Sequence, residues 1–148
     1  MTIEGIIIER AVAADLRAIH ALEQRCFPSP WRREFFESEL ANEGRFNLVA
    51  RREGVIVGYL FAMWILEDMH INKIAVDENL RRQGVALALM QRCLAFASER
   101  SVTSISLEVR QSNHEAQEFY RFLDFEAEYI RSAYYPDGEA AVVMMKEL

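Results

Sequence analysis

The sequence predicts an α+β or mixed α/β fold with one central sheet, and two observations support this. Strand-like and helix-like segments mix along the whole chain, which is typical of a sheet that carries helices on its faces. The chain has 148 residues, 51% hydrophobic and 27% charged, so it can bury a core without disulfides or metal. We therefore expect one domain that spans residues 1–148.

The first half of the chain is expected to contribute four strands and two helices. Leu16, Ile19 and Leu22 recur at helical spacing, and the proline-containing segment 27–31 ends that helix before the next one begins. The pair Glu53-Gly54 between two strands is typical of a tight β-hairpin turn. The expected strands are residues 6–10, 46–52, 55–66 and 69–76, and the expected helices are residues 14–25 and 32–42.

The second half begins with a long amphipathic helix, because its apolar residues fall on one stripe. Ser112 and Glu115 have the spacing of a capping box, so a further helix is expected to start there. The expected helices are residues 84–99 and 113–122, and the expected strands are residues 104–110, 125–131 and 140–146.

The composition argues against several classes of function. The net charge of −6 disfavours nucleic acid as a main partner and mildly favours cationic substrates. No apolar run reaches the roughly 20 residues of a membrane span, and the start of the chain lacks a signal-peptide pattern. We therefore expect a cytoplasmic protein without a membrane partner. Cys26 and Cys93 are expected to be free thiols, with Cys93 in the core, and the scattered histidines predict no metal site.

The strand at 69–76 contains a break in its alternation. Met69 and Ile71 share one phase, whereas Ile74 and Val76 share the other. A β-bulge near Asn72-Lys73 would produce this slip and would leave backbone groups unpaired. An irregularity at a sheet edge is the alternative interpretation.

The segment after this strand has the features of an anion-binding turn. A helix begins near Gly84, where a glycine lets the backbone approach a ligand closely and the helix start offers free N–H groups. Arg81 and Arg82 are available for charge-assisted hydrogen bonds to a phosphate. The alternative is an ordinary strand–turn–helix with solvated arginines.

Two side chains further along are candidates for proton transfer. Glu108 lies in mid-strand between apolar neighbours, where a carboxylate is expected to have a raised pKa and to be able to act as a general base. The alternative is a half-exposed glutamate paired with an arginine. Tyr120 lies on the apolar stripe of the helix at 113–122, and its hydroxyl needs a partner if it is buried. It can be a core tyrosine or a catalytic acid.

These features, in this order, resemble the GCN5-related N-acetyltransferase (GNAT) superfamily, which takes the acetyl group from acetyl-CoA. The family's pyrophosphate-binding pattern is Arg/Gln-x-x-Gly-x-Gly/Ala, and Arg81, Gly84 and Ala86 match it. Its later asparagine and tyrosine match Asn113 and Tyr120. The resemblance implies the GNAT fold: one mostly antiparallel sheet of about six to seven strands with a splayed parallel pair, flanked by about four helices.

A closer resemblance, to the bacterial ribosomal-protein-alanine N-acetyltransferases, covers nearly the whole chain. The segments that carry it are residues 26–31, 74–77, 107–110, 112–113 and 134–138. One departure is Asp124, which stands where the family often has glycine in a Tyr-x-x-x-Gly-Phe pattern.

The resemblance assigns roles to individual residues. Glu108 matches the general base, acting directly or through water, and Tyr120 matches the acid that protonates the departing CoA thiolate. The cofactor contacts that it implies are Ile74, Ala75, Val76, Arg81, Arg82, Gln83, Gly84, Val85, Ala86, Leu87 and Asn113. The substrate contacts that it implies are Phe27, Trp31, Tyr134 and Tyr135.

The function that follows is acetyl transfer from acetyl-CoA to the N-terminal α-amine of a protein. The resemblance implies an alanine-starting, S18-like ribosomal protein as acceptor, and the chemistry predicts direct attack without an acyl-enzyme. An α-amine has a pKa near 7.7–8.0, against about 10.4 for a lysine side chain. A single carboxylate can therefore deprotonate an N-terminal amine more readily than a lysine, which modestly favours N-terminal amines as acceptors. An acetyltransferase for small amines and a non-catalytic acetyl-CoA-binding regulatory module are the alternatives. We expect a monomer or a weak dimer.

Overall fold

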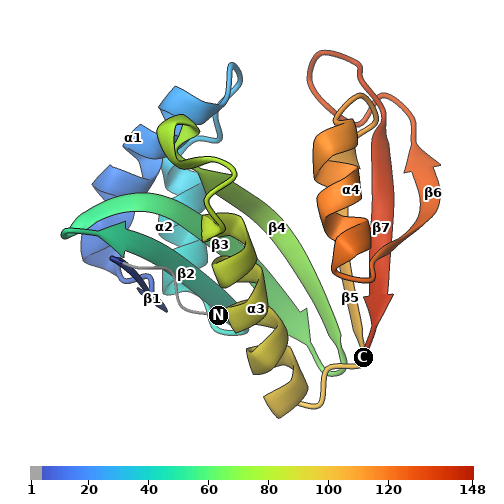
Figure 1. The fold of residues 1–148 in the computed structure, drawn as a ribbon, viewed down its shortest axis with the longest axis horizontal. Helices are drawn as coiled ribbons and strands as arrows, with labels where there is room; N and C mark the ends of the chain where they lie inside the picture. The colour runs from blue at the N-terminus through green and yellow to red at the C-terminus, as the bar shows by residue number, and fades with distance from the viewer. Residues whose placement is uncertain (1–4) are drawn as a thin grey trace.

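The computed structural model describes residues 5–148, which form a seven-stranded sheet and four α-helices (Figure 1). The remaining four residues of the predicted domain, 1–4, lie outside the described residues. The helices are α1 (Leu16–Cys26), α2 (Arg33–Ala41), α3 (Val85–Glu99) and α4 (His114–Phe122). The strands are β1 (Ile6–Arg10), β2 (Arg45–Arg52), β3 (Val55–Ile65), β4 (Asp68–Val76), β5 (Ser104–Arg110), β6 (Glu126–Arg131) and β7 (Ala141–Glu147).

The strands are arranged in the order β1-β2-β3-β4-β5-β7-β6. Within residues 5–148 the β4–β5 pair is parallel and every other neighbouring pair is antiparallel. The β4–β5 ladder runs from Asp68↔Ser104 to Ile71↔Leu107 and ends there, although both strands continue. Figure 1 shows β4 and β5 diverging beyond this point. The predicted fold with its splayed parallel pair is therefore confirmed.

The predicted bulge in β4 is also confirmed. In the pairing with β3, Phe61 lies opposite Lys73 and Ala62 lies opposite Ile71, so Asn72 is the extra residue. The bulge exchanges the faces on which successive side chains point. As a result Met69 and Ile71 pack on one face of the sheet, whereas Ala75 packs on the other.

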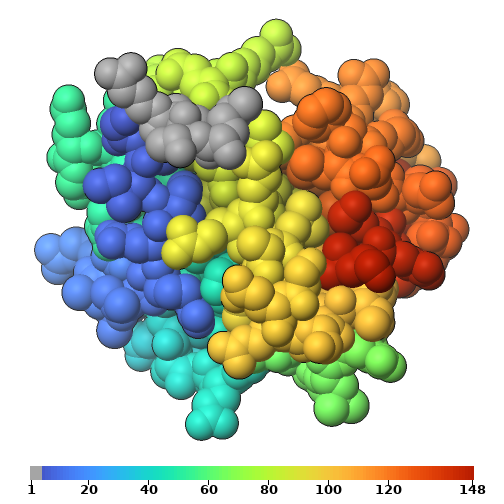
Figure 2. Space-filling model, turned by 60° about the horizontal axis from the view of Figure 1, so that its bottom comes forward, coloured from blue at the N-terminus to red at the C-terminus, as the bar shows by residue number. Residues whose placement is uncertain are grey.

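The two faces of the sheet carry separate hydrophobic cores. On one face, α3 and α4 pack against residues such as Leu60 of β3 and Leu107 of β5. On the other face, α1 and α2 pack against Tyr59 and Phe61 of β3. Alternate residues of the same strand serve opposite cores, as the pleat requires. In Figure 2, α3 (yellow) lies between the N-terminal elements (blue to cyan) and the C-terminal segment (orange to red).

Local predictions hold with small corrections. The Glu53-Gly54 hairpin turn has positive φ at both residues, 51° and 80°, as a two-residue loop of this kind requires. The start of α4 is capped by Asn113, whose side-chain oxygen accepts a hydrogen bond from the N–H of Ala116. The predicted capping role of Ser112 is wrong. In the part of the chain that the structure describes, no helix is long and apolar enough to cross a membrane.

Candidate active site

A cleft of about 740 Å³ opens where β4 and β5 separate. Its walls are the end of β4, the turn that leads into α3, the first residues of α3, and one side of α4. Ten of the eleven predicted cofactor contacts line it: Ile74, Ala75, Val76, Arg81, Arg82, Gly84, Val85, Ala86, Leu87 and Asn113. Gln83 is absent from this lining, and its side-chain amide lies 3.5 Å from the carbonyl oxygen of Asn79.

The turn into α3 exposes the backbone toward the cleft. Gly84 adopts a left-handed conformation with φ of 85° and stands directly before Val85, the first residue of the helix. The first N–H groups of a helix have no partner within it, and the helix dipole places partial positive charge there. The first turn of α3 contains no acidic residue. The turn can therefore hold an anion such as a pyrophosphate through backbone N–H groups.

Charged side chains surround the mouth of the cleft. Arg82 is exposed and pairs with Glu115 of α4 across 3.0 Å. Such an exposed pair is weak in water, so a phosphate can compete for the guanidinium. Asn113 uses its side-chain oxygen to cap α4, which leaves its amide nitrogen available to a ligand at the same edge.

The end of β4 offers a second set of backbone groups. Ile74, Ala75 and Val76 pair with β3 on one side, but the ladder with β5 has already ended at Ile71. Their edge on the β5 side therefore faces the cleft. An extended chain or an acyl carbonyl can bind there in the manner of an added strand.

Tyr120 reaches the cleft from α4. Its side chain is 7% exposed, and burial raises the pKa of its hydroxyl, so it keeps its proton at neutral pH. It is thus available as a donor to a group that develops negative charge. Cys26 also borders the cleft, but burial raises the pKa of its thiol, which disfavours the nucleophilic thiolate.

Glu108 lies on the opposite face of β5 from the cleft. Leu107 and Val109 point into the core beneath α4, whereas Glu108 alternates with them. Its Oε2 lies 2.8 Å from Nε2 of His70, and its Oε1 accepts a hydrogen bond of 3.2 Å from Arg131.

The pKa of Glu108 is lowered. Burial alone raises it, but the contacts with His70 and Arg131 together outweigh burial. The prediction of a raised pKa is therefore wrong, because these two partners come from other strands. The pairing with an arginine, which was the alternative interpretation, is present.

Of the predicted acceptor residues, Phe27 and Trp31 pack on the face that carries α1 and α2, and Phe27 also lines the cleft. Trp31 contributes to a shallow depression of about 680 Å³ whose far side is formed by Pro136. The segment after α1 and the segment between β6 and β7 therefore meet around one groove. The rings of Tyr134 and Tyr135 are 5.0 Å apart, and burial raises the pKa of Tyr135 to about 12.

A buried ion pair fixes the segment after α1. Glu23 has no exposed surface, and its carboxylate accepts hydrogen bonds from Tyr59 and from the backbone N–H of Trp31, the latter at 2.9 Å. Nζ of Lys73 lies 3.2 Å from the same carboxylate and 3.6 Å from the centre of the Phe27 ring. Burial lowers the pKa of Lys73, and Glu23 opposes that change.

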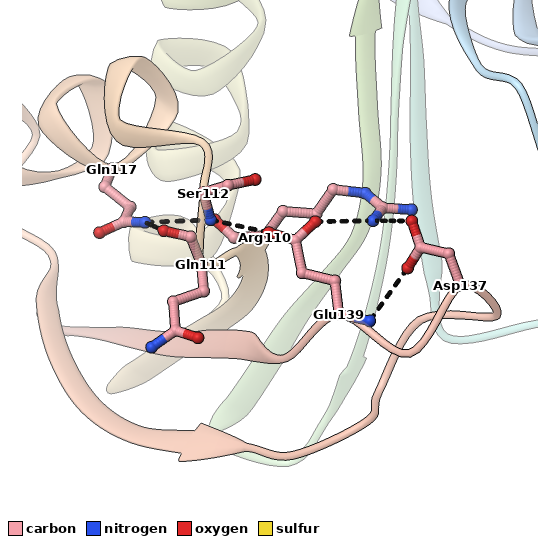
Figure 3. A network of polar contacts seen from close by, with 6 residues as sticks. All are labelled: Arg110, Gln111, Ser112, Gln117, Asp137 and Glu139. Carbon is pink, nitrogen blue, oxygen red and sulfur yellow. Dashed lines mark hydrogen bonds and ion pairs between the residues drawn. The ribbon is translucent and has the colours of Figure 1, made fainter.

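A second polar network fixes the segment between β6 and β7 (Figure 3). Glu139 accepts a hydrogen bond of 2.8 Å from Arg110 and another of 2.8 Å from the N–H of Ser112. Asp137 binds the same guanidinium at 2.9 Å. Gln117 of α4 donates to the carbonyl oxygens of Arg110, the last residue of β5, and of Gln111. The network therefore joins the start of α4 to the segment between β6 and β7 that carries Tyr134 and Tyr135, and it holds the two segments in a fixed relative position.

The sequence reasoning missed several residues that shape this site. Glu23 carried a usable signal, because it lies four residues after Ile19 and thus falls on the apolar face of α1. His70 and Arg131 carried none, since only the strand order places them beside Glu108. In residues 5–148 no group of three or more histidine, cysteine or acidic side chains could hold a metal ion.

Comparisons with known proteins agree with this geometry. The model of the acetyltransferase (GNAT) family matches residues 16–125. The chain is 32% identical over 133 residues to the ribosomal protein bS18-alanine N-acetyltransferase of Escherichia coli (strain K12), covering 88% of this chain and 89% of that protein.

Two solved structures are similar over nearly the whole chain. The crystal structure of the Escherichia coli alanine N-acetyltransferase superposes with a TM-score of 0.91 at 32% identity, covering 96% of this chain and 93% of that one. Ard1 from Thermoplasma volcanium gives a TM-score of 0.89 at 26% identity, covering 97% and 98%. The family match extends over most of the chain and includes the cleft, the turn into α3 and Tyr120. The chain therefore belongs to the acetyltransferase (GNAT) family.

Proposed function

We propose that the protein transfers the acetyl group of acetyl-CoA to the N-terminal α-amine of a protein, by direct attack of the amine. The acceptor that we propose is an alanine-starting ribosomal protein of the bS18 kind. This choice follows the name of the Escherichia coli relative, ribosomal protein bS18-alanine N-acetyltransferase. One observation carries the proposal. The splayed strands separate a face with a cleft and a protonated tyrosine from a face with a carboxylate and an aromatic groove.

Acetyl-CoA fits the chemistry of the cleft. The N–H groups at the start of α3 and the guanidinium groups of Arg81 and Arg82 would bind its pyrophosphate. The free edge of Ile74–Val76 would bind the pantetheine arm and orient the acetyl carbonyl. The thioester would then lie at the split between the strands, within reach of both faces.

The acceptor would approach from the other face. Its amine arrives mostly protonated at neutral pH and must lose a proton before it can attack. Glu108 is the carboxylate on that face, and Arg131 and His70 hold it in place. The neutral amine attacks the carbonyl carbon, the C–S bond breaks, and Tyr120 gives its proton to the departing sulfur.

We propose no acyl-enzyme, because the cleft supplies no activated nucleophile. The thiol of Cys26 donates to the carbonyl oxygen of Val76, not to a basic side chain that could deprotonate it. Burial raises the pKa of this thiol. Cys93 is buried in the core, where burial raises its pKa to about 12. Neither thiol is suited to accept the acetyl group.

The proposal is tested by measuring the CoA thiol that is released from acetyl-CoA with three acceptors. These are an alanine-starting peptide with the N-terminal sequence of a bS18 protein, the same peptide with a blocked N-terminus and an added lysine, and spermidine. We expect release with the first peptide, and mass spectrometry should place the acetyl group on its α-amine. Preference for spermidine would favour a small-amine acetyltransferase. Binding of acetyl-CoA without release in any assay would favour a regulatory module.

The cellular acceptor is tested separately. We propose that the protein acts in the cytoplasm as a monomer or weak dimer, without nucleic acid, membrane or metal. Mass spectrometry of protein N-termini from cells with and without the gene should show an alanine N-terminus whose acetylation depends on it. An unchanged set of acetylated N-termini would contradict the proposed acceptor class.

A further inference from the structure

A row of polar side chains on the acceptor face runs from β5 to β4, returns to β5 and continues to β6. It consists of Ser106, His70, Glu108 and Arg131. We propose that His70 acts with Glu108 as a carboxylate–imidazole pair that receives the proton of the acceptor ammonium and passes it to solvent. This inference rests on the proposed function and assigns a positioning and proton-holding role to a residue that acts through Glu108.

The contacts of His70 involve both ring nitrogens. Nε2 lies 2.8 Å from Oε2 of Glu108, and Nδ1 lies 2.8 Å from Oγ of Ser106. The parallel register places His70 directly beside Ser106, so the contact follows from the strand pairing. Two short contacts from one ring fix its orientation. The imidazole is thereby held against the carboxylate rather than free to rotate into the groove.

Ser106 allows this ring to change its protonation state without losing a hydrogen bond. When the imidazole is neutral, Nε2–H donates to Glu108 and Nδ1 accepts from the Ser106 hydroxyl. When the imidazole is protonated, both nitrogens donate, and the hydroxyl rotates to accept instead. A hydroxyl can serve in either role, whereas a lysine or a carboxylate could not. The pair is therefore satisfied both before and after it gains a proton.

The side chains beside His70 and Ser106 on the neighbouring strands are uncharged. Met63 of β3 flanks His70, and Met145 of β7 flanks Ser106, so the neighbouring strands bring no charge at these positions. The charged and titratable groups on the remaining parts of this face include Asp68 and Lys73 of β4, Arg110 of β5, Glu126, Tyr129 and Arg131 of β6, Glu147 of β7, and Tyr134 and Tyr135. Among these Arg131 binds Glu108 directly, while Lys73 is paired with Glu23 and Arg110 with Glu139.

Glu108 alone is a weak base for an ammonium group, and the imidazole of His70 supplies a stronger one. A carboxylate whose pKa is lowered by His70 and Arg131 is a weak base toward an ammonium group. An imidazole is the side chain that ordinarily changes charge near neutral pH. The ring takes the proton at Nδ1, because Nε2 already carries a proton that it donates to Glu108. The Ser106 hydroxyl passes its own proton to Nδ1 and takes one from the acceptor ammonium or an intervening water. Glu108 then stays ionised and stabilises the imidazolium across the 2.8 Å contact. The side chain of His70 is also the more exposed of the two, 29% against 12%, so it offers the exit to water.

The protons balance over one turnover. The acceptor ammonium gives one proton to the pair, and the neutral amine forms the N–C bond. The C–S bond breaks with its electron pair on sulfur, and Tyr120 protonates the thiolate. The nitrogen then loses its second proton, which restores Tyr120. The proton on His70 leaves to solvent, so the products are the N-acetyl peptide, CoA and one proton.

The test compares His70→Gln with the wild type at pH 7 and pH 9. Glutamine keeps an N–H donor for Glu108 but cannot hold the proton. At pH 7 we expect kcat/KM for the alanine-starting peptide to fall at least about tenfold. At pH 9 the amine is already neutral, since α-amines have pKa values near 7.7–8.0, and we expect the two proteins to agree within about twofold. The dissociation constant of acetyl-CoA should be the same in both.

Two further variants make the result decisive. Ser106→Ala removes the adaptable partner and should give a smaller loss with the same pH dependence. His20→Gln in α1, whose ring packs near Phe36, is the matched control and should follow the wild type at both pH values. Thermal unfolding of each variant measures any loss of fold.

Each outcome is informative. A deficit of equal size at pH 7 and pH 9 assigns His70 a structural role and overturns the inference, as does the absence of a deficit. In either case the wild-type activity leaves the proposed function standing. If the wild type itself does not acetylate the peptide at either pH, the proposed function fails and this inference fails with it.

Discussion

Glu108 shows how neighbours decide the chemistry of a single carboxylate. Its lowered pKa means that it is ionised throughout the neutral range and held by Arg131 at 3.2 Å. Glu108→Gln keeps the shape and one acceptor oxygen but removes the charge. We expect kcat for the alanine-starting peptide at pH 7 to fall about 100-fold, while acetyl-CoA binding is retained, because Glu108 lies outside the cleft. Stopped assays and calorimetric titration measure the two quantities. Equal turnover in both proteins would remove Glu108 from the proposed role.

Loss of the Glu23 carboxylate should destabilise the groove that Trp31 and Pro136 line. Glu23→Gln would leave the ammonium of Lys73 buried without its counter-charge and weaken the hold on the Trp31 backbone. Breaking one partner of a buried pair costs about 3–5 kcal/mol of unfolding free energy. Urea unfolding measures this, and the KM for the peptide should rise as well.

Two further variants separate charge from packing at this pair. Glu37→Gln on the exposed side of α2 is the control and should change the unfolding free energy by less than about 0.5 kcal/mol. In the double variant Glu23→Gln with Lys73→Met, no unpaired charge is left, so the loss should be smaller than the sum of the two single losses. Additive losses would contradict the assigned pairing.

At the scale of elements, the corner between α4 and β6 carries a strained residue. Asp124 has φ of 70°, a left-handed conformation that costs a side chain about 1–2 kcal/mol and a glycine much less. We expect Asp124→Gly to raise the unfolding free energy by about 0.5–1 kcal/mol, and Asp124→Ala to lower it. Turnover should be unaffected by the glycine variant, since the corner lies outside the cleft lining. A destabilised glycine variant would show that the Asp124–Lys146 ion pair at 3.8 Å outweighs the backbone strain.

The segment between β6 and β7 should respond to acid through Glu139. Its contacts with Ser112 and Arg110 lower its pKa to about 2 from an ordinary 4.5. A carboxyl group with a depressed folded-state pKa stabilises the fold above its unfolded pKa, and this contribution is lost as the pH falls from about 4.5 to about 2. Tyrosine fluorescence at constant temperature should report loosening of Tyr134 and Tyr135 in this window. Glu139→Gln should remove that change, whereas Glu128→Gln on exposed β6 should not.

The elements themselves could be predicted from the sequence because their signals are local. Alternation within β4 located the bulge to Asn72-Lys73, and helical spacing located α1 through α4. The cap of α4 could not be assigned in the same way, because Ser112 and Asn113 are adjacent and both suit the position. Glu139, 27 residues further on, binds the N–H of Ser112 and so belongs to a tertiary contact that no local pattern contains.

The whole molecule is two half-sheets joined by a short parallel ladder. β1 to β4 form one half and β5 to β7 the other, and four residue pairs from Asp68↔Ser104 to Ile71↔Leu107 connect them. The strand end, the turn and the helix start that line the cleft could be predicted together because they are consecutive in the chain. The partners of Glu108 could not be predicted, since they depend on the order in which strands from both halves lie side by side. The residues of the cleft could thus be predicted from sequence patterns, whereas the charged partners of Glu108 on the other face could not.

This division predicts where acetyl-CoA should stabilise the protein. The proposed cofactor would contact β4 and α3 in one half and α4 in the other, and would therefore bridge the open end of the split. At a ligand concentration of 100 times the dissociation constant, binding should add about 2.7 kcal/mol to the unfolding free energy. Hydrogen exchange should slow at the amides of Ile74 and Val76, whose N–H groups point away from β3, and at residues 83–87, because these N–H groups gain partners. The hairpin between β2 and β3 should keep its exchange rate and serves as the internal control. Protection confined to α3 would be consistent with pyrophosphate binding at the turn into α3 but would contradict the bridging role of β4. It would also contradict the proposed position of the thioester where β4 and β5 separate.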